Sequence, residues 1–202
     1  MEKPILTDAK TSNGVDRRSF FRAAASLAGG VVLWHFWTRE PVQANPYYAG
    51  GAPKLVKIVQ FSDAGKKLGV VSEPQVVKSD EEWRKQLTPD EYEITRNAGT
   101  ERPFTGTLLN VHDKGVFRCI CCDNALFSAS TKFDSGTGWP SFWAPIASEN
   151  VIETTDSSLG MERTAVSCRL CVAHLGHVFN DGPQPTGLRY CMNSLAMKFA
   201  KA

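Results

Sequence analysis

Apolar and polar positions in the first well-patterned part of the chain have the period of a β-strand. Residues 55–61, Leu-Val-Lys-Ile-Val-Gln-Phe, alternate in part between apolar and polar side chains, which is typical of a strand with one buried face. A polar turn follows at 62–65, and the apolar residues at 68–71 can return beside the first strand. We therefore predict a β-hairpin here.

The next segment carries helical start signals. Ser79 is followed three residues later by Glu82, which is the spacing of a capping box. Thr88 begins a second short helix, because Pro89 suits the first helical position, and this helix should end before Gly99. We expect both helices to pack as a cap on the residues that follow.

From residue 100 onward the pattern changes to short apolar segments separated by glycine and proline. No strand–helix–strand alternation and no internal repeat is visible in this part of the sequence. Strand-like segments occur at 115–120, 152–155, 163–167, 177–179 and 188–192. The pattern predicts a mainly β fold of short antiparallel sheets with helices at one end.

Composition adds little to this picture. The hydrophobic fraction of 42% is ordinary for a globular protein and allows a sizeable core. The net charge is +2, and beyond residue 44 the chain holds equal numbers of acidic and basic residues. Nothing in this balance favours nucleic acid or an anionic surface as a partner.

The first 44 residues have the layout of an export signal. Paired arginines at 17–18, followed by Ser-Phe-Phe-Arg, precede a mostly uncharged run of 15 residues at 23–37. A transmembrane helix needs roughly 20 residues, so this run is short. Val42-Gln43-Ala44 suits cleavage after Ala44. The leader resembles a twin-arginine signal, so we expect the export machinery as a partner and a periplasmic location; an uncleaved leader would tether the protein to the membrane.

Four of the six cysteines form two C-x-x-C pairs. Each pair can form a tight knuckle that directs two sulfurs at one point, and two knuckles supply the ligands of a tetrahedral zinc site. We expect one structural Zn²⁺ per chain, bound by Cys119, Cys122, Cys168 and Cys171. The alternatives are two structural disulfides, which an exported protein can form, and a redox-active C-x-x-C.

Cys191 stands apart from these pairs. A lone cysteine is often only a small buried hydrophobe, and neighbouring loop histidines often only form hydrogen bonds. Here, however, His174, His177 and Arg189 lie within eighteen residues of one another and of Cys191. That combination favours a nucleophilic cysteine.

Four longer segments carry a family resemblance. Residues 99–106 (GTERPFTG), 132–142 (KFDSGTGWPSF), 174–179 (HLGHVF) and 189–194 (RYCMNS), together with the cysteine pairs, resemble the B-type methionine sulfoxide reductases. The resemblance covers roughly residues 80–200. It implies reduction of the R epimer of methionine sulfoxide in oxidised proteins or peptides, a fold of two small antiparallel sheets with short flanking helices, a structural zinc site, and recycling by a thioredoxin-like or other thiol reductant.

With this resemblance the chain divides into three parts. We expect the export signal at 1–44, an N-terminal extension or linker at 45–78, and the methionine-R-sulfoxide reductase domain at 79–202. We also expect a monomer.

The chemistry of the reaction assigns roles to the C-terminal cluster. Sulfoxide reduction needs a thiolate that attacks sulfur and an acid that protonates oxygen. Cys191 is the predicted nucleophile, and Arg189, on the same strand face, is expected to favour its thiolate. His177 is the predicted proton donor with His174 assisting, because histidine titrates near neutral pH. Asn193 shares the face of Cys191 and is expected to orient substrate or a water.

Trp139 and Phe179 are the predicted substrate-binding residues. Gly138 and Pro140 flank Trp139 and present its indole, whose face suits the S-methyl group of the substrate. The family resemblance adds Phe179 to the methyl pocket.

The sequence departs from a common family pattern at the step that follows attack. Attack leaves a sulfenic acid on Cys191. Many family members have a resolving cysteine between the two glycines of 136–138, where this chain has Thr137. We favour direct reduction by an external thiol; resolution by Cys121, or by a thiol released from the metal site, is the alternative.

Two other functions fit part of the pattern. A zinc-knuckle binding module without chemistry explains the four paired cysteines but leaves the cluster around Cys191 unused. A C-x-x-C thiol–disulfide oxidoreductase predicts no tightly bound zinc and a reversible disulfide within one pair.

Overall fold

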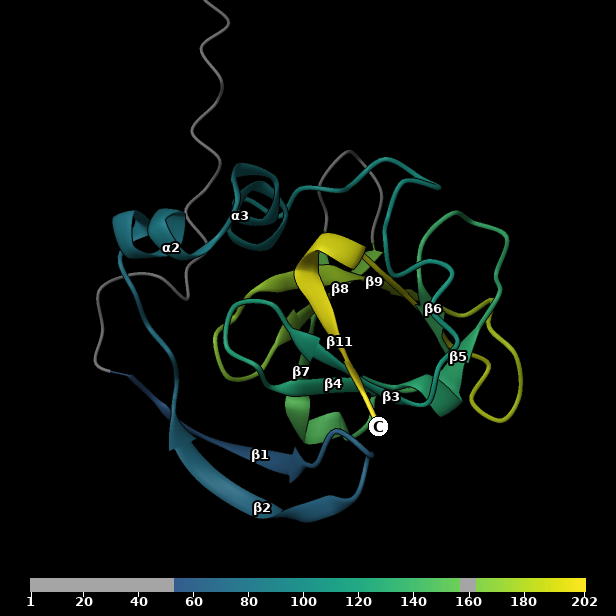
Figure 1. Ribbon diagram of the computed structural model, residues 1–202, viewed down its shortest axis with the longest axis horizontal. Coiled ribbons are helices and arrows are strands. Elements are labelled where there is room, and N and C mark those ends of the chain that lie inside the picture. The colour runs from purple at the N-terminus through teal and green to yellow at the C-terminus, as the bar shows by residue number, and fades with distance from the viewer. Residues whose placement is uncertain (1–52, 157–162) are drawn as a thin grey trace, which may run out of the picture. The chain divides into compact units, whose positions relative to one another are not determined.

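Residues 53–156 and 163–202 are described in the computed structural model of this chain, and the predicted leader at 1–44 lies outside them. The described residues form antiparallel sheets with a few short helices, which confirms the predicted fold class (Figure 1). Within these two ranges no helix is both long enough and apolar enough to cross a membrane.

The strands from residue 115 onward form two sheets. The strands of the six-stranded sheet, in spatial order, are β5 (Lys132–Phe133), β6 (Ser141–Phe142), β10 (Arg189–Met192), β9 (His174–Phe179), β8 (Arg163–Cys168) and β7 (Val151–Asp156). The three-stranded sheet contains β11 (Met197–Lys201), β3 (Gly115–Cys119) and β4 (Ala125–Ser128). Among the described residues, single-turn 3₁₀ helices at 129–131, 148–150 and 194–196 connect strands. One of the two sheets is therefore larger than the small sheets expected.

The predicted hairpin adds a third sheet. β1 (Leu55–Phe61) pairs antiparallel with β2 (Lys67–Pro74), as the alternating pattern indicated. Ile58 and Val59 on β1 are buried, so this hairpin packs against the rest of the fold.

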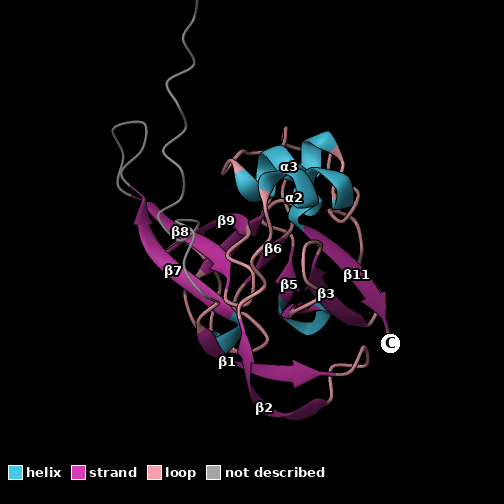
Figure 2. Ribbon diagram, turned by 90° about the vertical axis from the view of Figure 1, so that its left-hand side faces the viewer, coloured by secondary structure: helices cyan, strands magenta, loops and turns pink. Residues whose placement is uncertain are grey.

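The two predicted helices are confirmed, with their caps. α2 (Asp80–Gln86) and α3 (Pro89–Arg96) each have a complete capping box, formed with Ser79 and with Thr88. Figures 1 and 2 show the helices at one end of the described fold and the β1–β2 hairpin at the other. Trp83 of α2 and Ile94 of α3 are buried, and so each helix contributes to the core.

Three phenylalanines join the two larger sheets. The ring centroids of Phe127 on β4 and Phe142 on β6 are 4.5 Å apart, and Phe117 on β3 meets Phe142 edge-on at 4.9 Å. All three side chains are fully buried. Burial of a phenylalanine side chain stabilises a fold by roughly 1.5–3 kcal/mol, so this trio is a main contact between the sheets.

A buried asparagine attaches the hairpin to the domain. Asn150 Oδ1 accepts from Val59 N–H at 2.7 Å, and its Nδ2 donates to the carbonyls of Val59 and Ala125 at 2.8 and 2.7 Å. The Asn150 side chain thus pairs with the backbone of β1 although the two partners are 91 residues apart in sequence.

We predict that Asn150→Ala lowers the free energy of unfolding by about 2–4 kcal/mol. The substitution leaves one buried N–H and two carbonyls without their partner, and each such loss costs about 1–3 kcal/mol before relaxation. Urea unfolding measures this. Gln60→Ala is the matched control, because Gln60 is on the same strand but exposed, and it should change stability by less than about 0.5 kcal/mol. Equal effects of the two substitutions would contradict the role given to Asn150.

Candidate active site and metal site

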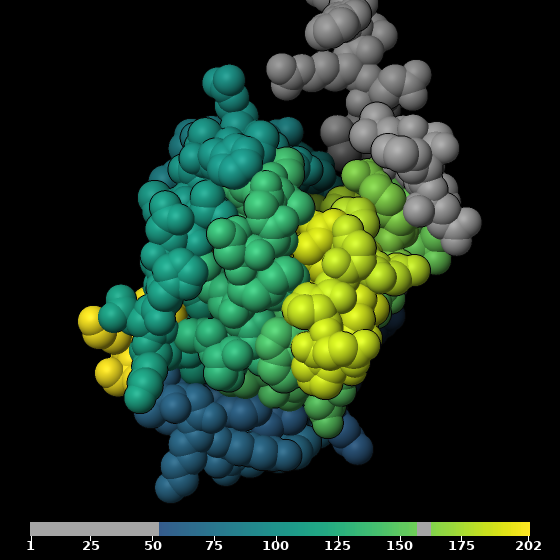
Figure 3. All heavy atoms as spheres, turned by 90° about the vertical axis from the view of Figure 1, so that its right-hand side faces the viewer, coloured from purple at the N-terminus to yellow at the C-terminus, as the bar shows by residue number. Residues whose placement is uncertain are grey.

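Five of the seven residues predicted for catalysis or substrate binding line one pocket. It has a volume of about 140 Å³ and is lined by Thr100, Trp139, Arg163, Gly176, His177, Phe179, Cys191 and Asn193. Figure 3 shows the green segment around residues 130–145 beside the yellow-green segment around 180–190 on one face of the molecule. His174 and Arg189, the other two predicted residues, lie behind the pocket wall.

Strand pairing places the thiol beside the histidine. Cys191 on β10 is directly opposite His177 on β9 in the antiparallel register, so both side chains lie on the same face. The strands approach closely at Gly176: a Cβ there would lie 2.1 Å from the carbonyl oxygen of Cys191. Glycine between the two histidines is therefore a requirement of this pairing.

Hydroxyl groups surround the Cys191 thiol. Thr137 Oγ1 lies 3.8 Å from Cys191 Sγ, and Ser135 Oγ lies within 2.8 Å of Thr137 Oγ1 and 2.7 Å of Ser141 Oγ. Burial raises the pKa of Cys191, while the Thr137 contact and the charge of Arg189 oppose that rise. The charge of Arg189 thus opposes the effect of burial, but burial outweighs it and the pKa of Cys191 lies above its ordinary value.

The two histidines have different surroundings. His177 Nε2 lies 2.8 Å from Asp156 Oδ2, which also accepts from Arg163 at 2.9 Å. His174 is buried behind His177, with ring centroids 5.3 Å apart, and burial lowers its pKa to about 4. His174 is therefore neutral at pH 7, and of the two only His177 lines the pocket.

Arg189 supports Phe179, which is one wall of the pocket. Its guanidinium donates to both carboxylate oxygens of Asp181, at 2.9 and 2.8 Å, and this pairing raises the pKa of Arg189 and lowers that of Asp181. The same guanidinium lies 4.4 Å from the ring centroid of Phe179. Arg189 thereby orients Phe179 while its charge acts on Cys191.

Asn193 and Glu101 join the segment after Cys191 to the loop before Trp139. Asn193 Nδ2 donates to the Leu175 carbonyl at 3.1 Å, and its Oδ1 accepts from Glu101 N–H at 3.0 Å. The Glu101 carbonyl accepts from Trp139 Nε1 at 3.1 Å. The buried Glu101 carboxylate also accepts from the backbone N–H groups of 194 and 195, at 2.7 and 3.0 Å. Asn193 is thus a positioning group for this wall as well as part of its lining.

Three acidic residues of the site were not assigned roles from the sequence. Asp156 holds His177, Asp181 holds Arg189, and Glu101 holds the segment that follows Cys191. Glu101 lies within the segment 99–106 that carries the family resemblance, and Asp181 lies in the turn before Arg189, so both had a sequence signal. Asp156 has no such signal, because its partner His177 lies on β9, two strands away from β7 in the sheet.

The four paired cysteines converge on one point, as predicted. Their sulfurs all lie within 4.8 Å of one another, with 3.6 Å between Cys119 and Cys171 and between Cys122 and Cys168. A regular tetrahedron with sulfurs about 2.3 Å from a central zinc has edges of about 3.8 Å, so the cluster fits a tetrahedral metal. The close pairs join different knuckles, whereas a redox-active C-x-x-C would pair its own two sulfurs.

Val76, just after β2, and Gln86, at the end of α2, each form a hydrogen bond to one of the two cysteine knuckles. Val76 N–H donates to the Leu170 carbonyl at 2.8 Å, and Gln86 Nε2 donates to the Cys121 carbonyl at 2.7 Å. Cys121 is buried beside the metal cluster, where its thiol interacts with that of Cys119, and it does not line the pocket of Cys191.

Comparison with known proteins identifies the family. The SelR domain matches residues 87–201, which is more than half of the chain. The chain is 55% identical over 128 residues to a Hahella chejuensis protein named peptide methionine sulfoxide reductase MsrB, covering 63% of this chain and 92% of that one. Proteins of the same name from Leptospira interrogans and Pseudomonas putida are 56% identical over 127 residues and 57% over 125, covering 63% and 62% of this chain and 97% and 94% of theirs. The chain belongs to the SelR-domain family of B-type methionine sulfoxide reductases.

Proposed function

We propose that this protein reduces the R epimer of peptide-bound methionine sulfoxide with Cys191 as the nucleophile. The observation that carries the proposal is the placement of Cys191 directly opposite His177 in a pocket walled by Trp139 and Phe179. Family membership and the relatives' activity support the reaction class.

In this mechanism Cys191 Sγ attacks the sulfoxide sulfur and the sulfur–oxygen bond of the substrate breaks. The bond that this attack forms between Cys191 Sγ and the substrate sulfur breaks when the oxygen, as water, adds to Cys191 Sγ. The substrate sulfur leaves with the bonding electron pair as methionine, and Cys191 keeps one oxygen and one proton as a sulfenic acid. His177, held by Asp156, is the group placed to supply a proton to the departing oxygen. Trp139 and Phe179 present apolar faces to the S-methyl group, and the neutral His174 supports the ring of His177.

Return to the thiol requires an external reductant in this proposal. Thr137 is in contact with Cys191 where a resolving cysteine would be, and Cys121 lies at the metal cluster. Two thiols of a thioredoxin-like or other reductant then convert the sulfenic acid to the thiol, with release of water and formation of a disulfide on the reductant.

We predict one methionine per protein when excess R-sulfoxide peptide is mixed with the enzyme without reductant. Mass spectrometry and thiol labelling should show a sulfenic acid on Cys191 and no disulfide. Cys191→Ser should form no methionine, and Cys121→Ser should behave as wild type. Thr137→Cys should instead yield a disulfide, because Oγ1 of Thr137 lies 3.8 Å from Cys191 Sγ. A disulfide between Cys191 and Cys121 in the wild type would contradict direct reduction.

We further propose that the metal at the four-cysteine cluster is zinc in a structural role. Four thiolates at tetrahedral spacing leave no open coordination position, which is typical of structural zinc. Asn124 Nδ2 donates to Cys168 Sγ at 3.5 Å and would support a thiolate there. When bound, the metal supplies folding free energy and takes no part in sulfoxide chemistry.

We predict that Cys119→Ser removes bound zinc and lowers the thermal midpoint by more than about 10 °C, because a structural zinc site contributes several kcal/mol to folding. Metal analysis of the purified protein and thermal unfolding measure both effects. Cys121→Ser is the matched control, since Cys121 adjoins the cluster without being one of its four ligands, and it should retain one zinc per chain. Loss of zinc from both variants would place Cys121 among the ligands.

We also propose that the leader directs export by the twin-arginine route, supported by Arg17-Arg18 and the short apolar run after them. Cell fractionation should find a periplasmic protein of 158 residues, the length that remains after cleavage at Ala44. Replacement of both arginines with lysine should leave the full-length chain in the cytoplasm. Full-length wild type in the cytoplasm would overturn this proposal.

A further inference from the structure

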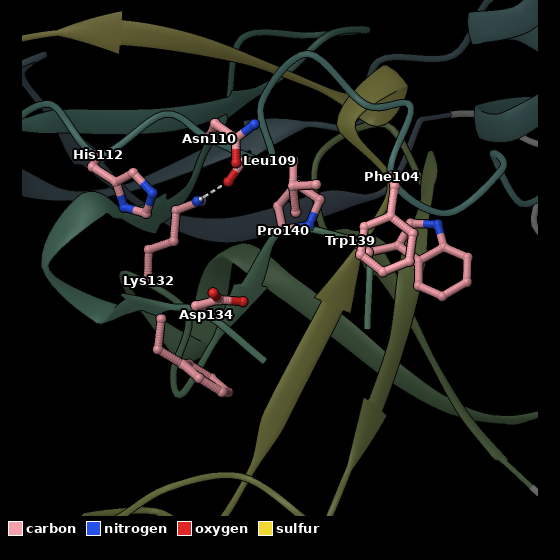
Figure 4. Close-up of a pocket in the computed structure, with 10 residues that line it drawn as sticks. Phe104, Leu109, Asn110, His112, Lys132, Asp134, Trp139 and Pro140 are labelled. Carbon is pink, nitrogen blue, oxygen red and sulfur yellow. Dashed lines mark hydrogen bonds between the residues drawn. The ribbon is translucent and has the colours of Figure 1, made fainter. Parts of the chain in front are cut away.

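A second pocket adjoins Trp139. It has a volume of about 160 Å³, and its lining includes Trp139 as the active-site pocket does. Figure 4 shows its two ends: aromatic rings at one and polar side chains at the other. The aromatic end contains Phe104 and Trp139, and the polar end contains Asn110, His112, Lys132 and Asp134. Neither a cysteine nor a metal-cluster residue lines it, so it offers binding groups without a nucleophile.

Phe104 at the aromatic end is exposed and has an unusual backbone conformation. Its side chain is 68% exposed, and its φ of +64° lies in the left-handed region that bulky residues rarely adopt. The conformation is held by a hydrogen bond from Phe104 N–H to the Gly138 carbonyl at 2.8 Å. A Cβ at Gly138 would lie 2.9 Å from the Phe104 ring, so the ring packs closely against the backbone at Gly138, next to Trp139. Strained conformations of this kind concentrate at binding sites.

The polar end can bind a peptide backbone. Lys132 is half-buried, and its ammonium donates to the Leu109 carbonyl at 2.6 Å, which fixes its position and leaves two further N–H groups (Figure 4). Asp134 Oδ1 accepts from Gly136 N–H at 2.9 Å, which fixes that carboxylate. The Asn110 amide at this end has both a donor and an acceptor, as a peptide group needs.

We propose that this second pocket binds the polypeptide next to the oxidised methionine, with an apolar neighbouring side chain on Phe104 and the peptide backbone at Asn110 and Lys132. Because Trp139 is a wall of both pockets, a sulfoxide side chain beside Cys191 places the adjoining chain at the aromatic end of the second pocket. The inference rests on the proposed function and deepens it, since it assigns the recognition of the substrate's peptide chain to named residues.

The test compares two substrates of the R epimer: an N-acetylated, C-amidated methionine sulfoxide and a capped pentapeptide with the sulfoxide at its centre. In the wild type, kcat/KM should be at least about ten-fold higher for the pentapeptide. Phe104→Ala should remove most of that advantage, about ten-fold, through KM, because an aromatic platform contributes on that scale. The same variant should change kcat/KM for the capped single residue less than about two-fold.

Two further variants separate binding from folding. Phe104→Gly also lacks the ring but accepts the left-handed conformation without strain, so it should reproduce Phe104→Ala. Leu68→Ala is the control: Leu68 is 61% exposed on the β1–β2 hairpin, and its loss should affect neither substrate. Equal losses on both substrates in both Phe104 variants, or equal wild-type kcat/KM for the two substrates, would overturn the inference. Failure of the wild type to reduce either substrate would instead contradict the proposed function.

Discussion

The convergence of four sulfurs is the constraint on which the rest of the structure depends. Cys119 ends β3 of the three-stranded sheet and Cys122 lies just after it, while Cys168 ends β8 of the six-stranded sheet and Cys171 lies between β8 and β9. A metal held by these four sulfurs would tie the two sheets together, as the phenylalanine trio does elsewhere between them. β9 begins three residues after the second knuckle and carries His177 to the pocket. The position of the histidine is therefore linked to the position of the four-cysteine cluster.

Local signals made part of the fold predictable. The hairpin at 55–74 and both capped helices were predicted because each depends on residues close together in sequence. The strands β5 and β6 were missed because each has two residues, too few for a period to be visible. β9 starts at His174, three residues before its predicted start. The pairing of His174 with Ser167 of β8 follows a register shift between the two strands, and the sequence of β9 does not indicate that pairing.

The sequence predicts the site residues that lie in recognisable motifs. It does not predict the carboxylates that hold those residues in place. Cys191, His177 and Trp139 lie in segments with a family resemblance, and the structure places all three in one pocket. Their supporting carboxylates come from elsewhere: Asp156 ends β7 and reaches His177 across the sheet. Such pairs depend on sheet order, which spacing along the chain does not reveal. Glu101 lies in the motif at 99–106, but its role depends on a contact in the folded chain, where the segment after Cys191 passes beside it.

Thr137 also affects how readily Cys191 would be irreversibly oxidised during oxidative stress. With a hydroxyl beside Cys191 and no second cysteine among the described residues that line its pocket, each turnover of the proposed cycle leaves an oxidised sulfur without an adjacent thiol. The lifetime of that sulfur is then set by the supply of external thiol. If oxidant arrives first, the sulfenic acid advances to a sulfinic acid, and that step is irreversible in most proteins. A threonine at position 137 in place of a resolving cysteine thus makes the retention of activity depend on the concentration of reducing thiols around the enzyme.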